Sequence, residues 1–136
     1  MQFDMTNNDL MRKAGDARVQ SHAPYSGYSV GAALLDEQGQ LHMGCNVENA
    51  AYPEGICAET NAIGSMVTAG GKQIVTIAIL GGCGDPGPCT PCGGCRQRIK
   101  EFSNDETVIL LRDAEGTIKK YSISDLLPMS FSFDGN

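Results

Sequence analysis

Ile74-Val75-Thr76-Ile77-Ala78-Ile79-Leu80 is the most strand-like run of this 136-residue chain, and the other elements are predicted outward from it. Its nearly continuous branched apolar side chains are typical of a central strand that is buried on both faces of a sheet. The glycine- and proline-rich residues 81–91 predict a loop, in which Thr90 and Pro91 would cap and begin a helix. That helix leads to a second apolar run at 107–111. Two strands joined by a crossover helix predict a parallel pair.

The segment before this unit predicts two helices on either side of a hairpin. Thr6, with Asp9 three residues later, is a plausible helix start, and Gly70 with Gly71 is a typical helix end. Between the helices, two apolar runs flank a polar turn that contains Gly39, as in a hairpin. The expected elements are a helix at 6–19, strands at 28–35 and 41–45, and a helix at 58–69.

The segment after the unit predicts a short last strand at 117–123 and one helical turn at 124–127, before Pro128. Helices and strands in this order predict an α/β fold, with a mixed sheet of about five strands and helices on both faces. A length of 136 residues suits one hydrophobic core, so we expect residues 1–136 to form a single domain.

The composition excludes several classes of partner. Sixteen acidic residues against ten basic ones give a formal net charge of −6, which disfavours binding to nucleic acid or to anionic membranes. The N-terminus lacks the basic start and apolar run of a signal peptide, and no apolar run is long enough to span a bilayer. Six cysteines without an export signal predict reduced thiols and a cytoplasmic protein.

Three cysteines are placed to hold a metal ion. Cys57 is expected at the start of the helix at 58–69, and Cys92 and Cys95 in the first turn of the next helix. Free amides and the helix dipole at both N-termini favour bound thiolates. With three thiolate ligands, a zinc ion keeps its fourth position open for water, as in catalytic zinc sites. Glu59 can then carry protons between that water and a substrate.

Cysteine spacing alone leaves other sites open. Cys89 extends the pattern to C-x-x-C-x-x-C, and a fourth thiolate from Cys57 or Cys83 would make a closed zinc site or an iron–sulfur site. A redox C-x-x-C pair is a further alternative, although it gives Glu59 no role. A non-enzymatic structural zinc or iron–sulfur module is therefore the competing class of function.

The irregular segment 46–55 is expected to be a ligand-facing loop, because polar residues such as Asn46 and Glu48 precede its proline and glycine breakers. Neither His22 nor His42 stands at ligand spacing from the cysteines, so both are interpreted as surface or turn residues. By default, three aromatic side chains would serve core or edge packing: Tyr25, Tyr28 and Phe131.

Two motifs together match the signature of zinc-dependent deaminases, in which a His or Cys, one residue and a Glu precede Pro-Cys-x-x-Cys. They are Cys57-Ala58-Glu59 and Pro91-Cys92-Gly93-Gly94-Cys95. The chain thereby resembles the small homotetrameric cytidine deaminases, over about residues 10–131. Further motifs that carry the resemblance are Pro24-Tyr25-Ser26-x-Tyr28-x-Val30-Gly31-Ala32-Ala33-Leu34, Gly44-Cys45-Asn46-Val47-Glu48-Asn49-Ala50, Cys95-Arg96-Gln97, Glu101-Phe102 and Leu126-Leu127-Pro128.

This resemblance implies a cytidine deaminase-like fold of α-β-α layers and hydrolytic deamination of cytidine and 2′-deoxycytidine to uridine products, with release of ammonia. It implies one zinc ion per chain on Cys57, Cys92 and Cys95, and Glu59 as the proton carrier. It also implies a homotetramer with active sites at subunit interfaces. The implied substrate contacts are Tyr28 beside the base, Asn46 and Glu48 on the ribose 3′-hydroxyl, Ala58, and, from a neighbouring subunit, Ala51, Tyr52 and Phe131.

The chain departs from that family at three places. Thr60 stands where an arginine often follows the catalytic glutamate and compensates the thiolates, and we hypothesise that Arg96 supplies part of the missing charge. Tyr28 stands where phenylalanine is common, which adds a hydroxyl near the base. The tail reads Phe131-Ser132-Phe133 instead of aromatic-Gly-Pro.

A deaminase of a modified cytosine nucleoside or of a cytosine-containing antibiotic would share the catalytic motif, so it is the nearest enzymatic alternative. Asn46 and Glu48 favour a plain nucleoside. A polynucleotide deaminase is disfavoured because the chain is acidic and offers no basic stripe for phosphates. Pyrimidine salvage and the clearing of unusual nucleosides are both open as physiological roles.

Overall fold

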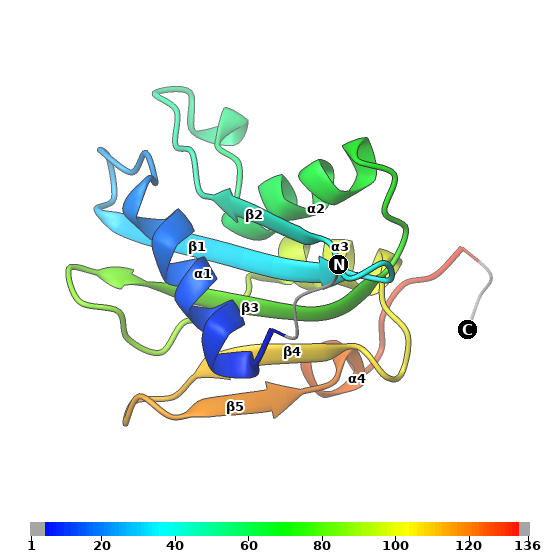
Figure 1. Cartoon of the computed structure of the whole chain (residues 1–136). Helices are drawn as coiled ribbons and strands as arrows, with labels where there is room; N and C mark the ends of the chain where they lie inside the picture. Colours follow the sequence, from blue (N-terminus) through cyan, green and yellow to red (C-terminus); the bar gives the residue numbers. More distant parts are fainter. Residues whose placement is uncertain (1–4, 134–136) are drawn as a thin grey trace.

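The computed structural model describes residues 5–133, which contain one five-stranded sheet, four helices and a 3-10 turn, η1 (Figure 1). The sheet order is β2-β1-β3-β4-β5, so the run predicted to be central is the middle strand, β3. The strands are β1 (Tyr28–Asp36), β2 (Leu41–Cys45), β3 (Ile74–Cys83), β4 (Val108–Arg112) and β5 (Ile118–Tyr121). The helical elements are α1 (Asn7–Val19), η1 (Tyr52–Glu54), α2 (Ala58–Thr68), α3 (Gly93–Glu101) and α4 (Ile123–Leu126).

The sheet is mixed, as predicted. β3 runs parallel to β4, with Thr76 opposite Val108, and α3 is the crossover helix between them. β1 and β2 form the predicted hairpin, β1 is also antiparallel to β3, and β5 closes the sheet antiparallel to β4. The predicted parallel pair is therefore confirmed.

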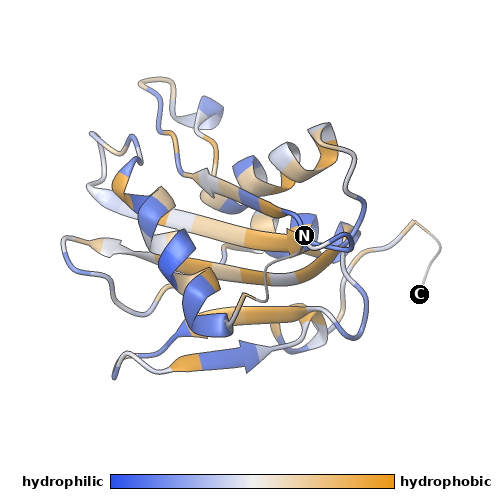
Figure 2. Ribbon diagram, in the orientation of Figure 1, coloured by the Kyte–Doolittle hydropathy of each residue, from blue (hydrophilic) through white to orange (hydrophobic). Residues whose placement is uncertain are grey.

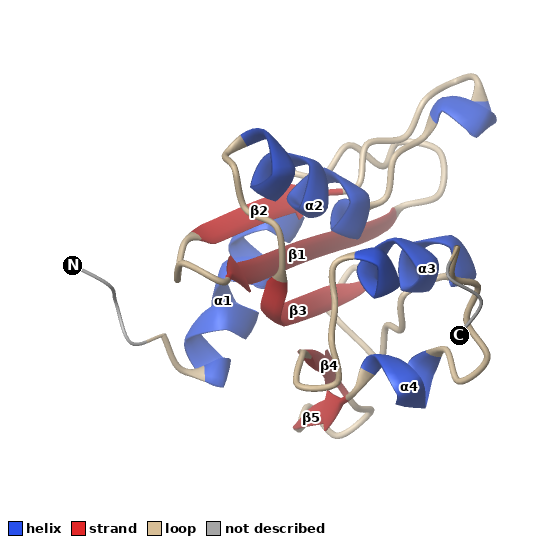
Figure 3. Cartoon of the chain, turned by 90° about the vertical axis from the view of Figure 1, so that its right-hand side faces the viewer, coloured by secondary structure: helices blue, strands red, loops and turns tan. Residues whose placement is uncertain are grey.

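Helices cover both faces of the sheet. Figure 3 shows α1 on one side and α2, α3 and α4 on the other. Ala32 and Ala33 of β1 belong to different core clusters, because successive side chains of a strand point to opposite faces. The larger cluster lies under α2 and α3 and includes Leu34, Met66, Ile79 and Ile99. The α-β-α layering is thus confirmed, and the site described below lies on the α2 and α3 side.

The apolar residues are concentrated in the sheet (Figure 2). α1 carries hydrophilic residues on its outer side, and β5 exposes Lys119 and Lys120. Within residues 5–133, no helix combines the length and the apolar character that crossing a bilayer requires.

Two glycines set how closely the helices approach the sheet. Gly31 of β1 lies directly under the α1 backbone at Ala14 and Arg18. Gly44 of β2 lies under α2, where an ideal Cβ would be 2.6 Å from the Ala58 carbonyl oxygen. Because any larger residue would meet helix backbone, Gly44 fixes the height of the first turn of α2 above the sheet.

Local patterns predicted most element boundaries correctly. Thr6 and Asp9 form the reciprocal capping box expected at the start of α1. The helical turn expected at 124–127 is present as α4, one residue earlier, with Ser122 and Asp125 in a second capping box. The loop expected to begin at residue 81 begins later, because β3 continues as far as Cys83.

The predicted start of α3 is wrong. Thr90 and Pro91 do not cap and begin the helix, since both lie in the preceding extended segment. The N-cap is Cys92, whose sulfur accepts a hydrogen bond from the Cys95 backbone N–H at 3.4 Å, and the first helical residue is Gly93. A cysteine is therefore the N-cap of both α2 and α3.

His42 is not the surface or turn residue that was predicted. It lies in β2, it is buried, and its Nε2 is 2.8 Å from the carboxylate of buried Asp36. Burial raises the pKa of Asp36, but hydrogen bonds from His42 and from the backbone N–H groups of Gln40 and Gln38 outweigh it and lower that pKa overall. The pair links β1 to β2, and the hydrogen-bonding capacity of the buried Asp36 carboxylate is satisfied.

Candidate active site

The N-termini of α2 and α3 bring three cysteine sulfurs together. Cys57 is the N-cap of α2, Cys92 is the N-cap of α3, and Cys95 lies in the first turn of α3. Their sulfur atoms all lie within 4.8 Å of one another. Sulfurs on a tetrahedral zinc ion, with Zn–S bonds of about 2.3 Å, are separated by about 3.8 Å. The three side chains therefore fit a zinc ion after small adjustments of their rotamers.

The chemistry of the three thiols also fits a cation. Burial raises the pKa of Cys57, and burial together with nearby Glu59 raises that of Cys95. Burial opposes ionisation of Cys92 too, but the Cys95 backbone N–H and neighbouring thiols donate to its sulfur and bring its pKa below the usual value. Two of the three sulfurs thus require nearby positive charge to exist as thiolates, which is what a divalent cation provides.

The other thiols lie outside this group. Among the described residues, Cys57, Cys92 and Cys95 form the only cluster of three or more potential metal ligands. Cys89 is buried and Cys83 is exposed, and neither belongs to the cluster. The geometry therefore disfavours a closed four-cysteine site and leaves one ligand position of a tetrahedral ion to a non-protein group.

Two side chains form hydrogen bonds with the sulfur of Cys95, and that of Arg98 donates. Thr60 Oγ1 lies 3.7 Å from it, and Arg98 Nη1 lies 3.8 Å from it. Arg96, which was expected to compensate the thiolates, makes other contacts: its guanidinium donates to the carbonyls of Pro91 and Leu126, each at 2.8 Å. That hypothesis is therefore wrong, because adjacent residues on a helix point in different directions.

Glu59 is a buried carboxyl group beside the sulfurs. It lies in the first turn of α2, and only 4% of its surface is exposed. Burial raises its pKa, although the Cys95 thiol and the charge of Arg98 act in the opposite direction. A carboxyl group with a raised pKa holds a proton more readily than a solvated one, which suits a role in general acid–base catalysis.

An open cleft of about 250 Å³ leads to this group. It brings together most of the site residues predicted from the sequence, on β1, the 46–55 loop and the starts of α2 and α3. Ser26, Val30, Cys89 and Thr90 line it as well, and sequence reasoning missed them. The predicted residues that line it are Tyr28, Asn46, Glu48, Cys57, Ala58, Glu59 and Cys92.

Asn46 also ties the 46–55 loop to β1. Its side-chain oxygen accepts from the Val30 backbone N–H, and its amide nitrogen donates to the Tyr28 carbonyl, both at 2.8 Å. Asn46 therefore holds the edge of the cleft in place through the strand that carries Tyr28.

Glu48 has a similar positioning role at the other end of the cleft. Its carboxylate accepts from the backbone N–H groups of Tyr25 and Ser26, at 3.0 and 3.1 Å, and from the Ser26 hydroxyl. These hydrogen bonds, the Ser26 hydroxyl first, lower the pKa of Glu48. Glu48 thus places a fixed negative charge in the exposed part of the cleft lining.

Tyr28 is partly exposed and faces the cleft rather than the core. A hydrogen bond with the Cys89 thiol and partial burial raise its pKa to about 12, so its hydroxyl stays protonated at neutral pH. The contact could have been suspected only from the fold, because Tyr28 and Cys89 are far apart in the chain. Tyr28 is thus not a core residue.

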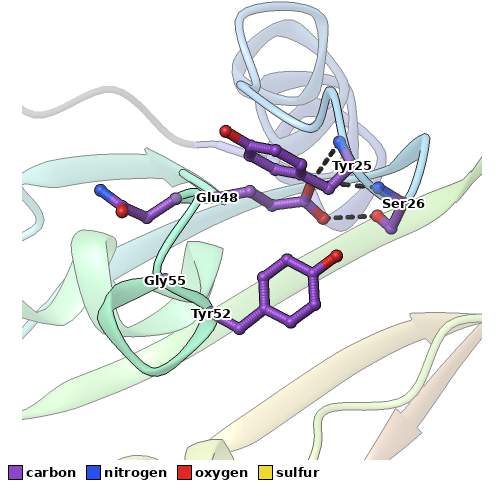
Figure 4. A pocket seen from close by; sticks show the side chains of 6 residues that line it. Tyr25, Ser26, Glu48, Tyr52 and Gly55 are labelled. Carbon is purple, nitrogen blue, oxygen red and sulfur yellow. Dashed lines mark hydrogen bonds between the residues drawn. The ribbon is translucent and has the colours of Figure 1, made fainter.

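A second hollow, of about 300 Å³, lies next to the cleft (Figure 4). Glu48 and Ser26 line both, so the two adjoin at these residues. Figure 4 shows the Glu48 side chain pointing toward the Tyr25–Ser26 backbone. The Tyr25 and Tyr52 rings meet edge to face there, with centroids 5.9 Å apart. Most of its lining comes from the 46–55 loop, which carries η1 and extends away from the sheet in Figures 1 and 3.

Three predicted substrate contacts do not line the cleft of their own chain: Ala51, Tyr52 and Phe131. Tyr52 and Phe131 are 75% and 72% exposed, and Ala51 is also exposed. Phe131 is attached to α3 through its backbone, where the Gln97 side chain donates to its carbonyl at 3.1 Å. Neither Phe131 nor Tyr25 is therefore a core residue, although Tyr25 does pack at the surface against the Tyr52 ring, as the edge-packing part of its default interpretation expects.

The chain matches known proteins over most of its length. Residues 5–111 match the family model of the cytidine and deoxycytidylate deaminase zinc-binding region. A cytidine deaminase of Sporosarcina psychrophila is 40% identical over 123 residues, which is 90% of this chain and 89% of that protein. A cytidine deaminase of Halalkalibacterium halodurans is 37% identical over 128 residues, 94% of this chain and 96% of that protein.

Solved structures give the same result. The crystal structure of cytidine deaminase from Burkholderia pseudomallei superposes with a TM-score of 0.84 at 40% identity, covering 93% of this chain and all of that one. Cytidine deaminase from Mycobacterium tuberculosis gives a TM-score of 0.82 at 33% identity, with 96% and 100% covered. The matched segments include the three clustered cysteines and Glu59.

Proposed function

This chain belongs to the cytidine and deoxycytidylate deaminase family, and we propose that it hydrolyses the 4-amino group of cytidine and 2′-deoxycytidine. The products are the corresponding uridine nucleosides and ammonia. The observation that carries this proposal is the meeting of three cysteine sulfurs and the buried Glu59 at one cleft. A structural zinc or iron–sulfur module would have no use for that carboxyl group.

The zinc ion would be held by Cys57, Cys92 and Cys95. Three protein ligands are the number found in catalytic zinc sites, where the fourth position is kept for water or substrate. When bound, zinc supplies a Lewis acid that makes a water molecule nucleophilic at neutral pH. The two helix N-termini help to hold the thiolates, because their amides and dipoles are positive ends.

Glu59 moves the protons of the reaction. Its carboxylate would accept a proton from the attacking water and pass it to the cytosine ring nitrogen, and it would then take the remaining proton from the hydroxyl of the tetrahedral adduct and deliver it to the departing amine. Its burial favours this exchange, because a raised pKa brings the protonated and ionised forms closer in energy. The first turn of α2 fixes the carboxyl group relative to the cysteine at the N-cap.

The remaining lining residues suit a nucleoside. We assign the ribose 3′-hydroxyl to Asn46 and Glu48, and the base to the space beside Tyr28 and Ala58. The described lining of the cleft contains two carboxylates, of Glu48 and Glu59, and no lysine or arginine. That charge favours an uncharged nucleoside over a nucleotide with a phosphate group.

We also propose that the active site is completed by a neighbouring copy of the chain in a homotetramer. A cleft of about 250 Å³ lies below the range of about 300–1,000 Å³ that is usual for small-molecule sites. Ala51, Tyr52 and Phe131 are exposed in one chain and would supply the missing walls. The exposed Tyr25 and Tyr52 pair adjoins the cleft, where such a contact is needed.

The cellular setting follows from the thiols. All six cysteines are free, and three of them would be needed as zinc thiolates. We therefore propose a reducing compartment, the cytoplasm, and one domain over residues 1–136.

One experiment tests the enzymatic proposal. Wild type and two variants are purified and analysed for metal. The variants are Glu59→Gln and the control Glu106→Gln, which removes an exposed carboxyl group far from Glu59 in the sequence. We expect one zinc per chain in all three and a loss of cytidine turnover of about 10²–10⁴-fold only in Glu59→Gln. Turnover is followed by the ultraviolet change on conversion of cytidine, with deoxycytidylate as the charged comparison. An iron chromophore, or equal rates in wild type and Glu59→Gln, would reject the proposal.

A further inference from the structure

The charge of the three-cysteine site is not balanced by the residue that follows Glu59. Three thiolates and one Zn²⁺ carry a net charge of −1, and a negatively charged oxygen ligand would add to it. Thr60, next to Glu59, offers only a hydroxyl, 3.7 Å from the Cys95 sulfur. A group with a full positive charge must therefore come from elsewhere in the fold.

Arg98 is placed to supply it. It lies three residues after Cys95 on α3, so the two side chains share one side of the helix. Its Nη1 lies 3.8 Å from the Cys95 sulfur. The approach passes over Gly94, where an ideal Cβ would be 3.4 Å from the same nitrogen. The guanidinium thus folds back along the first turn of α3 and lies in contact distance of Gly94.

The other nearby arginines are occupied by carbonyl groups. Arg96 bridges the carbonyls of Pro91 and Leu126, which joins the start of α3 to α4. Arg18 of α1 donates to the carbonyls of Ser29, Gly82 and Gly84. Among residues 5–133, Arg98 is the one cationic side chain with a hydrogen bond to a sulfur of the cluster.

We propose that Arg98, assisted by the Thr60 hydroxyl, compensates the negative charge of the three-cysteine site and thereby strengthens zinc binding. The inference rests on the proposed zinc site. Arg98 acts as a positioning residue, because it touches a metal ligand and not the substrate. Arginine suits the task, since its delocalised charge is weakly hydrated and its planar fork is pre-organised, so that less conformational entropy is lost per hydrogen bond. The compensating charge thus comes from α3, the helix that carries two of the three ligands.

The test compares the removal of two positive charges from the same helix. Arg98→Gln removes the charge beside Cys95, and Lys100→Gln removes one that is two residues away and points to another side of α3. The zinc affinity of each purified protein is measured by competition with a chromophoric chelator. We expect zinc binding to weaken about 10–100-fold in Arg98→Gln, as for other partners of metal ligands, and to change less than about twofold in Lys100→Gln.

A second pair of variants separates charge from packing. Arg98→Gln combined with Thr60→Arg returns a guanidinium to the Cys95 sulfur from α2, and it is expected to restore most of the zinc affinity. Arg98→Lys keeps the charge but loses the fork, and it is expected to bind zinc with an intermediate affinity. The metal-free forms of wild type and Arg98→Gln are expected to unfold at the same temperature, because Arg98 acts on the metal site. A purely structural role of Arg98 would instead shift the unfolding temperature of the metal-free variant.

Several results would overturn the inference. Unchanged zinc affinity in Arg98→Gln would do so and would leave the proposed zinc site intact. Equally weakened zinc binding in Lys100→Gln would show a general effect of net charge. Zinc binding in the double variant, Arg98→Gln with Thr60→Arg, that is as weak as in Arg98→Gln alone would rule out compensation by charge. A wild-type protein that binds no zinc would reject the proposed function itself, and the inference with it.

Discussion

Gly44 of β2 lies against the backbone of α2, so replacing it with alanine is expected to disturb the active site from a distance. An ideal Cβ at Gly44 would lie 2.5 Å from the Ala62 backbone nitrogen and 2.6 Å from the Ala58 carbonyl oxygen. Ordinary contacts begin at 3.4 Å, so α2 would have to move away by about 0.9 Å. Both of these atoms belong to the backbone, and a change of side-chain rotamer cannot relieve the clash.

That displacement has two measurable effects. Overpacking of this kind costs about 1–3 kcal/mol of the free energy of unfolding. α2 also begins at Cys57 and carries Glu59 in its first turn, and a misplacement of catalytic groups by about 1 Å lowers rates about 10²-fold. We therefore expect Gly44→Ala to lose stability and about two orders of magnitude in kcat/KM, although Gly44 does not line the cleft.

Gly64→Ala is the matched control on the same helix. No atom lies within 4 Å of an ideal Cβ at Gly64, so the added methyl group is expected to stabilise the helix by about 0.5–1 kcal/mol. Urea unfolding gives the free energies, and initial rates on cytidine give kcat/KM. Wild-type stability and activity in Gly44→Ala, or an equal loss in Gly64→Ala, would refute the argument that the backbone contact sets the position of α2.

Two further predictions concern other parts of the chain. Asp36→Asn is expected to lower the free energy of unfolding at neutral pH by about 1–3 kcal/mol, because it weakens a buried hydrogen-bonded pair with His42. The pKa of Asp36 is lowered from 3.8, so its contribution to the free energy of unfolding is complete above that pH and is lost as the pH falls through the folded-state value. Urea unfolding along a pH series should therefore show the stabilities of wild type and Asp36→Asn converging in acid. A constant difference between them would contradict this. Cys95→Ala is expected to abolish zinc binding and Cys89→Ala to retain one zinc per chain, since the Cys89 sulfur lies outside the cluster; metal analysis of both variants checks this, and equal losses would contradict the three-ligand site.

Local patterns were sufficient for the elements of this fold because most of them satisfy their neighbours locally. The branched residues of β3 fill both faces of the sheet, and Thr6 with Asp9 caps α1 without help from the rest of the chain. The pairing of Cys92 with Cys95 is also local. Adding Cys57 depended on the expected meeting of two helix starts, and the deaminase motif then favoured the three-ligand site over the four-cysteine alternatives.

Pairs formed across the fold were harder to predict. His42 becomes buried because the hairpin places it against Asp36, and Tyr28 meets Cys89 through the packing of β1 against the loop after β3. The contact between Arg98 and Cys95 could have been predicted from the sequence. Its spacing of three residues from Cys95 places it on the same side of a helix, whereas the adjacent Arg96 points elsewhere.

The placement of cysteines at two helix N-caps shows where function takes precedence over local stability. Ser, Thr, Asp and Asn are the preferred N-caps, and each is worth about 1 kcal/mol relative to a residue that cannot cap. Cys57 makes no side-chain hydrogen bond to cap α2, and Cys92 accepts one only through sulfur, at 3.4 Å. The capping boxes of α1 and α4, which carry no part of the site, show that this chain uses good caps elsewhere. The N-termini of α2 and α3 thus have weaker caps than those of α1 and α4, because their free amides are needed beside three thiolates.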